Sequence, residues 1–329
     1  MIISKTPYRV SFFGGSSDYP EWYLKNGGEV ISSTIDKYLY ISCRHLPNFF
    51  SHKHRIVYSK IEEVKKISEI QHSVVRELMN NYKSYFNQNG VEIHYDGDLP
   101  SRSGMGSSSC FVVGMIQLMN HFLKIKITKK NLALESINFE QVKLNEIVGS
   151  QDQIAASYGG FNNITFLKDG NFKVNKLLNK NLSEKFFENI FLIYTGLNRT
   201  AQYIAKTYVK KLNHSDKNIY RILEHVKIAK KLLTDSNFDE VGKLLNETWK
   251  IKRALSNKVS NNVIDDIYDL GMKNGSYGGK LLGAGGGGFI LFYVPKKNHA
   301  KFNKKMSKFE IVNIKPSQEG CQIIYDEKN

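Results

Sequence analysis

The sequence has few cysteines. Its 329 residues include three, Cys43, Cys110 and Cys321, and no two of them have the spacing of a metal-binding pair. An odd number of widely separated thiols is also a poor basis for a disulfide framework. We therefore expect reduced cysteines and a cytoplasmic protein.

Long apolar runs are absent as well. No segment approaches the ~20 apolar residues that a membrane-spanning helix needs. The N-terminal stretch MIISKTPYRVSFFGG has neither the apolar region nor the small-residue cleavage site of a signal peptide. Internal repeats and low-complexity linkers are also missing. These absences argue against membrane, secreted and repeat proteins.

Acidic residues are outnumbered, with 31 Asp and Glu against 47 Lys and Arg, which gives a formal net charge of +16 at pH 7. Such a surface attracts anions, including nucleic acids and phosphorylated small molecules. However, the lysines are spread along the chain, and we find no arginine-rich cluster and no nucleic-acid motif. The charge is that of a solvated lysine surface, and it is compatible with a phosphate-bearing substrate.

A chain of this length exceeds what one hydrophobic core usually serves, so we expect two domains. Both halves mix strand-like and helix-like patterns, which predicts the α+β class, with a boundary near residue 165. We expect strands at 91–95, 161–167, 191–194 and 289–294, and helices at 110–123, 131–148, 200–235, 238–257 and 263–272.

The first of three glycine-rich segments is PSRSGMGSSS, residues 100–109. It joins a predicted strand to a predicted buried helix, so backbone amides and the helix N-terminus converge where a phosphate group would be favoured. Gly104 and Gly106 allow a ligand to approach the backbone closely. No lysine follows the second glycine, so this is not a Walker loop. A serine-capped helix after a flexible loop is an equally good interpretation.

The second segment is TPYRVSFFGGSSDY, residues 6–19. Arg9 lies on one face of a predicted strand that runs into Gly14 and Gly15 and then reaches Asp18. These residues could line a polar pocket, although a hairpin with an edge arginine is the simpler interpretation. The third segment, GAGGGGF at 283–289, holds four consecutive glycines, whose entropy cost suggests close approach to a ligand or to another loop.

One carboxylate stands out by its helical spacing. The expected helix from residue 131 places five positions on one stripe: Ala133, Ile137, Glu140, Leu144 and Ile147. Glu140 is the charged member, and a carboxylate that faces inward needs a partner such as a cation or a metal ion. A solvated position at the rim is the alternative. Asp152 follows shortly afterwards on a loop that leads back toward the core.

Together these segments resemble the GHMP kinases, the superfamily of galactokinase, homoserine kinase, mevalonate kinase and phosphomevalonate kinase. The segment 100–109 is similar to the ATP-phosphate loop of that superfamily, and 279–289 and 6–19 are similar to its C-terminal and N-terminal motifs. The resemblance covers almost the whole chain. It implies an α+β, two-domain fold with a ribosomal-S5-like domain at 1–165, a ferredoxin-like domain at 166–329, and the active site between them.

The resemblance also implies roles. Asp152 would be the catalytic base, Arg9 would stabilise negative charge nearby, and Ser108 and Glu140 would hold Mg²⁺. The phosphates of ATP would lie against Pro100, Ser103, Gly104, Met105, Gly106, Ser107, Ser108 and Ser109. We expect the acceptor to contact Gly15, Ser16, Asp18, Gly285 and Gly286, together with Arg199.

The sequence departs from the superfamily pattern in three places. Gly15 and Ser16 stand where galactokinases have Glu-His, which argues against galactose, and Arg9 stands where mevalonate kinases have lysine. Met105 replaces leucine and conserves volume. The segments 6–23, 149–160 and 194–201 look most like D-glycero-D-manno-heptose 7-phosphate kinases.

The resemblance implies transfer of the ATP γ-phosphate to the anomeric hydroxyl of heptose 7-phosphate, for nucleotide-heptose and surface polysaccharide biosynthesis. Fucokinase-like sugar 1-kinases are an alternative within the superfamily. A catalytically inactive nucleotide- or nucleic-acid-binding protein is the non-enzyme alternative. We expect a sugar phosphate and ATP as partners, neither nucleic acid nor a membrane, and leave a homodimer open.

Arg199 is the expected anchor for the acceptor's phosphate. It follows a predicted turn at Gly196 and lies in the first turn of a helix expected from about Asn198, where the helix dipole disfavours a cation. An anion in the same place would explain it, because helix amides and a guanidinium can hold one phosphate together. An exposed arginine paired with a nearby acid is the alternative.

Overall fold

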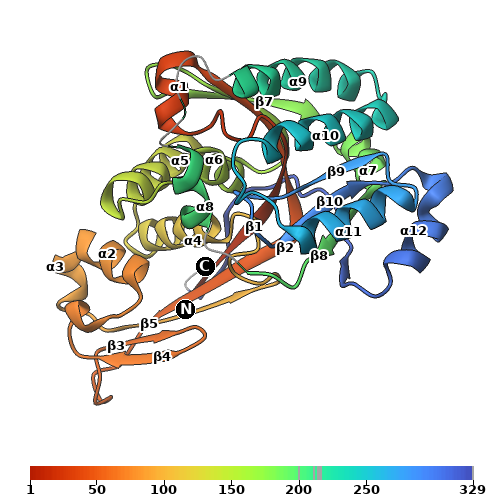
Figure 1. The fold of residues 1–329 in the computed structure, drawn as a ribbon. Coiled ribbons are helices and arrows are strands. Elements are labelled where there is room, and N and C mark those ends of the chain that lie inside the picture. The colour runs from red at the N-terminus through yellow and green to blue at the C-terminus, as the bar shows by residue number, and fades with distance from the viewer. Residues whose placement is uncertain (199–200, 210–211, 213–216, 328–329) are drawn as a thin grey trace.

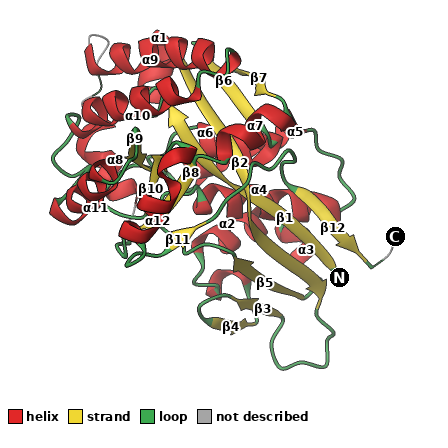
Figure 2. Cartoon of the chain, turned by 90° about the vertical axis from the view of Figure 1, so that its right-hand side faces the viewer, coloured by secondary structure: helices red, strands yellow, loops and turns green. Residues whose placement is uncertain are grey.

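The structure is a computed structural model, and it describes residues 1–198, 201–209, 212 and 217–327. Its first sheet has eight strands in the order β12-β1-β2-β5-β3-β4, with β6 pairing to β2 and to β7. The strands are β1 (Ile2–Phe13), β2 (Gly28–His45), β3 (His54–Val57), β4 (Ile61–Val64), β5 (Val91–Gly97), β6 (Phe161–Phe166), β7 (Phe172–Leu178) and β12 (Gln322–Asp326). Figure 2 shows the long strands β1 and β2 crossing the molecule.

Helices cover one face of this sheet. The most apolar of them is α4 (Ser107–Phe122), which packs on β1 and β2 and is buried along most of its length. Beside it lie α5 (Lys129–Asn138) and α6 (Gln151–Tyr158) (Figure 1). The smaller helical elements of this half are α1 (Pro20–Asn26), η1 (Ile67–Glu69), α2 (Ser73–Asn81), α3 (Lys83–Phe86) and a π-helical turn, η2 (Phe139–Lys143).

The second sheet has four antiparallel strands in the order β11-β8-β10-β9. They are β8 (Ile190–Tyr194), β9 (Gly278–Leu281), β10 (Phe289–Tyr293) and β11 (Ile311–Val312). The helical elements of this half are α7 (Lys180–Phe187), α8 (Ala201–Tyr208), α9 (Lys217–Thr234), α10 (Phe238–Arg253), α11 (Asn262–Lys273), η4 (Lys296–Asn298) and α12 (His299–Met306). Among them, α10 and α11 pack on β9 and β10.

An apolar cluster connects the two sheets. Phe12 of β1 stacks on Phe161 of β6, with ring centroids 5.3 Å apart, and both rings contact Phe186 of α7. Phe186 also stacks on Tyr293 of β10. Aromatic packing of this kind continues the hydrophobic core from the first sheet into the second. The ends of β1 and β9, which meet near this core, therefore have fixed relative positions.

The α+β prediction is confirmed, and so are the strands expected at 91–95, 161–167, 191–194 and 289–294 and the buried helix at 110–123. Asp152 was expected on a loop, but it lies in the first turn of α6. The helix expected over 200–235 is interrupted at Leu212, between α8 and α9. The helix expected over 131–148 is wrong beyond Lys143. The chain ends its helical course in the π-helical turn, and Asn145 adopts a left-handed φ of 52°. Leu144 and Ile147 continue the apolar spacing without continuing the helix.

The predicted division after residue 165 falls inside β6, which pairs with β2 and β7 in one sheet. The division of the chain into two domains stays a prediction. All three cysteines are buried free thiols. Within the described part of the chain, none of the helices combines the length and the apolar character needed to cross a bilayer.

Candidate active site

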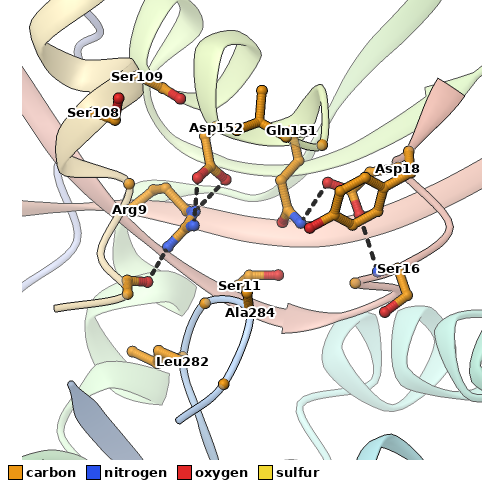
Figure 3. Close-up of a pocket in the computed structure, with 18 of the residues that line it drawn as sticks. Arg9, Ser11, Ser16, Asp18, Ser108, Ser109, Gln151, Asp152, Leu282 and Ala284 are labelled. Atoms are coloured by element: carbon orange, nitrogen blue, oxygen red, sulfur yellow. Dashed lines mark hydrogen bonds and ion pairs between the residues drawn. The ribbon is translucent and has the colours of Figure 1, made fainter. Parts of the chain in front are cut away.

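A polar pocket of about 330 Å³ lies where β1, the N-terminus of α4, α6 and the glycine-rich loop after β9 meet (Figure 3). Eleven of the residues predicted from sequence line it: Arg9, Gly15, Ser16, Asp18, Gly104, Gly106, Ser107, Ser108, Ser109, Asp152 and Gly285. The pocket therefore brings together segments from both halves of the chain.

The phosphate loop ends in an uncapped helix. Gly106 precedes α4 with a left-handed φ of 77°, and no side chain caps the first turn. The first amides of α4 are therefore available to a ligand, and the helix dipole favours an anion there. Ser107, Ser108 and Ser109 form this first turn and line the pocket. This arrangement fits the phosphate groups of a nucleotide.

The glycine-rich loop packs against the phosphate loop. A Cβ added to Gly104 would lie 2.5 Å from the carbonyl oxygen of Leu282, and one added to Gly283 would lie 2.6 Å from the Cα of Gly104. Both glycines also have positive φ. Glycine is therefore required where two loops from opposite halves of the chain touch. The sequence left two explanations open for the glycine-rich loop, close approach to a ligand or to another loop. Contact with another loop accounts for Gly104 and Gly283.

The Arg9 guanidinium clamps the Asp152 carboxylate. Its Nε and Nη2 donate hydrogen bonds to Asp152 Oδ1 and Oδ2, each at 2.6 Å, and its Nη1 donates to the carbonyl oxygen of Gly104 at 2.7 Å (Figure 3). Arg9 is 4% exposed, so it is not an edge arginine of a simple hairpin. Such a bidentate ion pair is strong and fixes the plane of the carboxylate. Asp152 therefore faces the pocket in one defined orientation.

Asp18 is a second carboxylate in the pocket, and its side chain is buried. Its Oδ1 accepts a hydrogen bond from the amide of Ser16 at 3.0 Å, and its Oδ2 accepts one from Gln151 Nε2 at 2.8 Å (Figure 3). Burial raises the pKa of Asp18, and the nearby charge of Asp152 adds to this effect. Ser16 has a left-handed φ of 86°, which costs free energy for a residue other than glycine. Strain of this kind is common at binding sites.

Glu140 is fully buried behind the phosphate loop, as the helical stripe predicted. Its Oε2 accepts hydrogen bonds from the Ser109 hydroxyl, at 2.7 Å, and from Gln153, whereas its Oε1 has no hydrogen-bond partner. Burial raises the pKa of Glu140 to about 7. An unsatisfied buried carboxylate oxygen is a site that a cation would stabilise.

The residues present fit a Mg²⁺ ion that is bound partly by the substrate's phosphates. In the described part of the chain they do not form a site in which protein side chains alone would hold a metal ion. Over the ranges that the structure describes, no three His, Cys, Asp or Glu side chains gather as a metal site. Mg²⁺ commonly uses one or two protein oxygens together with substrate phosphates and water. Glu140 could supply one such oxygen, and Ser108, exposed in the pocket, could supply another. The hydroxyl that contacts Glu140, however, belongs to Ser109.

Two lysines were missed by the sequence reasoning. Lys252 of α10 and Lys280 of β9 line the pocket and are 6% and 3% exposed. The signal for Lys252 was its place on the apolar stripe of α10, after Val241, Leu245 and Trp249. We find no comparable sequence signal for Lys280, because every residue of β9 is buried.

Several other expected site residues do not line the pocket. They are Pro100, Ser103, Met105, Glu140 and Gly286. Ser103 and Met105 are fully buried, and the amide of Gly286 donates a hydrogen bond to the carbonyl oxygen of Val259. Their contacts with ligands stay predictions. Arg199 lies outside the described residues.

The comparisons with known proteins agree with this geometry. The N-terminal domain description of the GHMP kinases matches residues 70–160, and their C-terminal domain description matches residues 229–305. These two matches are in the expected order and together span about half of the chain. The chain is a GHMP kinase.

The kinase is 29% identical to D-glycero-alpha-D-manno-heptose 7-phosphate kinase of Campylobacter jejuni over 310 residues, 91% of each chain. It is 24% identical to L-fucokinase/L-fucose-1-P guanylyltransferase of Bacteroides fragilis, covering 91% of this kinase and 35% of that enzyme. A crystal structure of a D-glycero-D-manno-heptose 1-phosphate kinase from Bacteroides thetaiotaomicron superposes with a TM-score of 0.79 at 21% identity, covering 99% and 100% of the two chains. That similarity shows the fold.

The family and its sugar-kinase relatives make this chain an ATP-dependent sugar kinase. The non-enzyme alternative is therefore set aside. The uncapped N-terminus of α4 and the Arg9–Asp152 pair both lie at the pocket of this kinase.

Proposed function

We propose that the kinase transfers the γ-phosphate of ATP to the anomeric hydroxyl of D-glycero-D-manno-heptose 7-phosphate and so forms the 1,7-bisphosphate. The similarity to the Campylobacter jejuni enzyme, over 91% of both chains, carries this proposal. The pocket supports it, because a strained turn at Ser16 and the buried carboxylate of Asp18 offer hydrogen-bonding groups to a sugar. The product would be a precursor of nucleotide-activated heptose for surface polysaccharide, made in the cytoplasm where ATP is available.

In this mechanism the amides of the first turn of α4 bind the ATP phosphates, with Gly104 and Gly106 allowing close approach. Phosphoryl transfer asks mainly for positioning and for neutralisation of charge. Mg²⁺, held by Glu140 and Ser108, would neutralise charge on the phosphates. Asp18, Gly15, Ser16, Gly285 and Gly286 would contact the acceptor.

Asp152 would accept the proton of the attacking hydroxyl or orient that hydroxyl. Both of its oxygens already accept a hydrogen bond from Arg9, and each carboxylate oxygen has a second lone pair for the acceptor. An anomeric hydroxyl is more acidic than an ordinary alcohol, so the demand on a base is mild. Arg9 would act by holding Asp152 in place as well as by its charge.

A sugar 1-kinase acting on fucose is the second candidate, favoured by the similarity to the Bacteroides fragilis enzyme. The deciding experiment supplies ATP with heptose 7-phosphate, unphosphorylated heptose, fucose or galactose and detects the product by mass spectrometry. We expect a bisphosphate from heptose 7-phosphate at the highest kcat/KM. Faster turnover of fucose would replace the heptose assignment.

Arg199 is proposed, on the sequence alone, as the anchor for the acceptor's phosphate. Arg199→Ala should raise KM for heptose 7-phosphate by ~10- to 100-fold, the scale of one charge-assisted contact, and leave KM for ATP nearly unchanged. An equal rise for ATP, or no change in either constant, would remove Arg199 from this role.

A further inference from the structure

Two buried ammonium groups in the pocket donate hydrogen bonds to backbone carbonyl oxygens. Lys252 Nζ donates a hydrogen bond to the carbonyl oxygen of Gly283, and Lys280 Nζ donates one to that of Phe12 at 3.1 Å. Among the described residues, no carboxylate forms an ion pair with either lysine. A buried charge without a counterion costs free energy. An anion that enters the pocket would remove that cost.

Arg9, which was expected to stabilise negative charge near Asp152, is already engaged by other groups. Arg9 uses its Nε and Nη2 on Asp152 and its Nη1 on Gly104. Its charge is balanced by the carboxylate that it holds. Lys252 and Lys280 are therefore the further buried cationic side chains that line this part of the pocket, together with the carboxylate of Asp18.

The position of Lys252 indicates which anion it would meet. Its hydrogen-bond acceptor, Gly283, touches Gly104 of the phosphate loop. Its ammonium also interacts electrostatically with Asp18 and Asp152, the two carboxylates that face the acceptor. Lys252 therefore lies between the expected ATP phosphates and the expected hydroxyl. Lys280, bonded to Phe12, lies farther along β1 toward Asp18.

Electrostatics support an anion at this point. Burial lowers the pKa of Lys252 to about 8, with Arg9 also lowering it and Asp18 and Asp152 raising it. Burial likewise lowers the pKa of Lys280 well below its usual value, and the charges of Lys252 and Arg9 add to this effect. A phosphate beside Lys252 would favour its charged form.

We propose that Lys252 is a catalytic residue that contacts the phosphoryl group in transfer. This inference rests on the proposed kinase reaction. In that reaction the acceptor oxygen forms a bond to the γ-phosphorus, and the bond from that phosphorus to the β–γ bridging oxygen breaks. Its electron pair leaves with ADP, and the hydroxyl proton passes to Asp152 or to water. Lys252 donates a hydrogen bond throughout and changes neither its oxidation state nor its covalent bonds.

Binding without turnover tests the proposal. Calorimetry with a non-hydrolysable ATP analogue and with ADP gives the preference of the protein for the γ-phosphate. In Lys252→Met, a neutral residue of similar length, this preference should fall by ~10- to 100-fold, while Kd for ADP stays within about 2-fold. Lys250→Gln, on the same helix but 61% exposed, is the matched control and should keep the preference.

The pH dependence gives a second readout. The pocket groups that face Lys252 are Arg9, Asp18, Asp152 and Lys280. Because its pKa lies near 8, Lys252 loses its charge as pH rises from 7 to 9.5. Wild-type affinity for the ATP analogue should fall over that range, and Lys252→Met should lose this dependence.

The kinetic consequence is a fall in kcat of ~10²- to 10³-fold in Lys252→Met, the usual effect of removing one preorganised donor from a developing charge. Lys252→Arg should recover part of both kcat and the preference for the ATP analogue. Retention of the γ-phosphate preference in Lys252→Met would overturn the proposal. A rise only in KM for the phosphorylated acceptor would also overturn it, by assigning Lys252 to the acceptor's own phosphate.

If Lys252→Met does not fold, Lys252→Gln and Lys252→Arg decide by the same binding ratio, with unchanged Kd for ADP as the sign of an intact nucleotide site. Failure of the proposed function can be distinguished from failure of the Lys252 proposal. A wild-type protein that turns over none of the sugars would refute that function, while the binding ratio would still test Lys252.

Discussion

At the scale of single residues, Asp152 makes the sharpest prediction. Asp152→Asn should lower kcat by ~10²- to 10⁴-fold, the usual contribution of a positioned base, and leave Kd for ATP near the wild-type value. The variant also removes the charge that balances Arg9, so its melting temperature should fall. Steady-state kinetics, calorimetry and thermal unfolding measure the three effects.

A matched control for this substitution is Asp266→Asn, because Asp266 is exposed on α11 and does not line the pocket. It should leave both kcat and the melting temperature unchanged. If Asp152→Asn kept kcat within a few-fold of the wild type, Asp152 would have neither the base role nor the orienting role.

Glu140 makes a prediction about the metal. Glu140→Gln and Ser108→Ala should each raise the Mg²⁺ concentration needed for the half-maximal rate, because hard cations prefer charged or hydroxyl oxygen ligands. Since Ser109 is the residue that bonds to Glu140, Ser109→Ala provides the comparison. Titration of the rate with MgCl₂ measures all three variants. Lower thermal stability with a normal Mg²⁺ requirement would make Glu140 a structural acid.

The sequence predicted the acidic residues of the candidate site better than its lysines. Glu140 was found because a lone charge on an apolar stripe is conspicuous, and it is buried. Lys252 and Lys280 belong to a chain with 47 Lys and Arg, in which most lysines are expected to be solvated. Their burial depends on contacts with Gly283 and Phe12, which are 31 and 268 positions away. The spacing along α10 could have indicated that Lys252 is buried, but local spacing carries no information on such partners.

At the scale of elements, the contact between the phosphate loop and the glycine-rich loop can be tested. Gly283→Ala combines a left-handed φ of 72° with a Cβ 2.6 Å from Gly104. Gly196→Ala has a φ of 73° with no atom within 4 Å of the added Cβ. We expect a cost of ~1–2 kcal/mol for Gly196→Ala, from backbone strain alone. Gly283→Ala should cost ~1–3 kcal/mol more, from overpacking.

Urea unfolding measures both free energies, and steady-state kinetics measure KM for ATP. Only Gly283→Ala should raise KM for ATP, because it displaces the phosphate loop. Equal losses of stability in the two variants would mean that the loops separate without cost and that their contact does not position the site.

Elements with strong local patterns were predicted well. The alternation at 91–95 gave β5, and the continuous apolar run at 110–123 gave α4. One error lay between 139 and 148, where apolar spacing persists but the helix changes to a π-helical turn and ends. The amide of Glu146 donates to the carbonyl oxygen of Glu140, so this backbone is satisfied outside a regular helix. The periodicity of the side chains does not show whether the backbone continues as a helix or leaves it.

At the scale of the whole molecule, the pocket depends on pairings between distant parts of the chain. The strand β12 pairs with β1, and the ammonium of Met1 contacts Glu327. The strands β6 and β7 extend the first sheet beyond the predicted boundary at residue 165. Turn and periodicity signals are local, so the sequence indicated the strands themselves but not these neighbours. The order of the glycine-rich segments was informative because it matched a known family.

The net charge of +16 makes a prediction about the whole molecule. Its lysines should draw anionic substrates toward the pocket, and salt weakens that attraction, since the Debye length falls from ~30 Å at 0.01 M to ~8 Å at 0.15 M. Across that range, kcat/KM for heptose 7-phosphate should fall by about 3- to 10-fold, within the scale of electrostatic steering. For unphosphorylated heptose it should stay nearly constant, because that acceptor has no charge to attract. An equal change in kcat/KM for both acceptors would mean that salt acts on ATP binding or on the chemical step. No change in kcat/KM for either acceptor would mean that the surface lysines only keep the protein solvated.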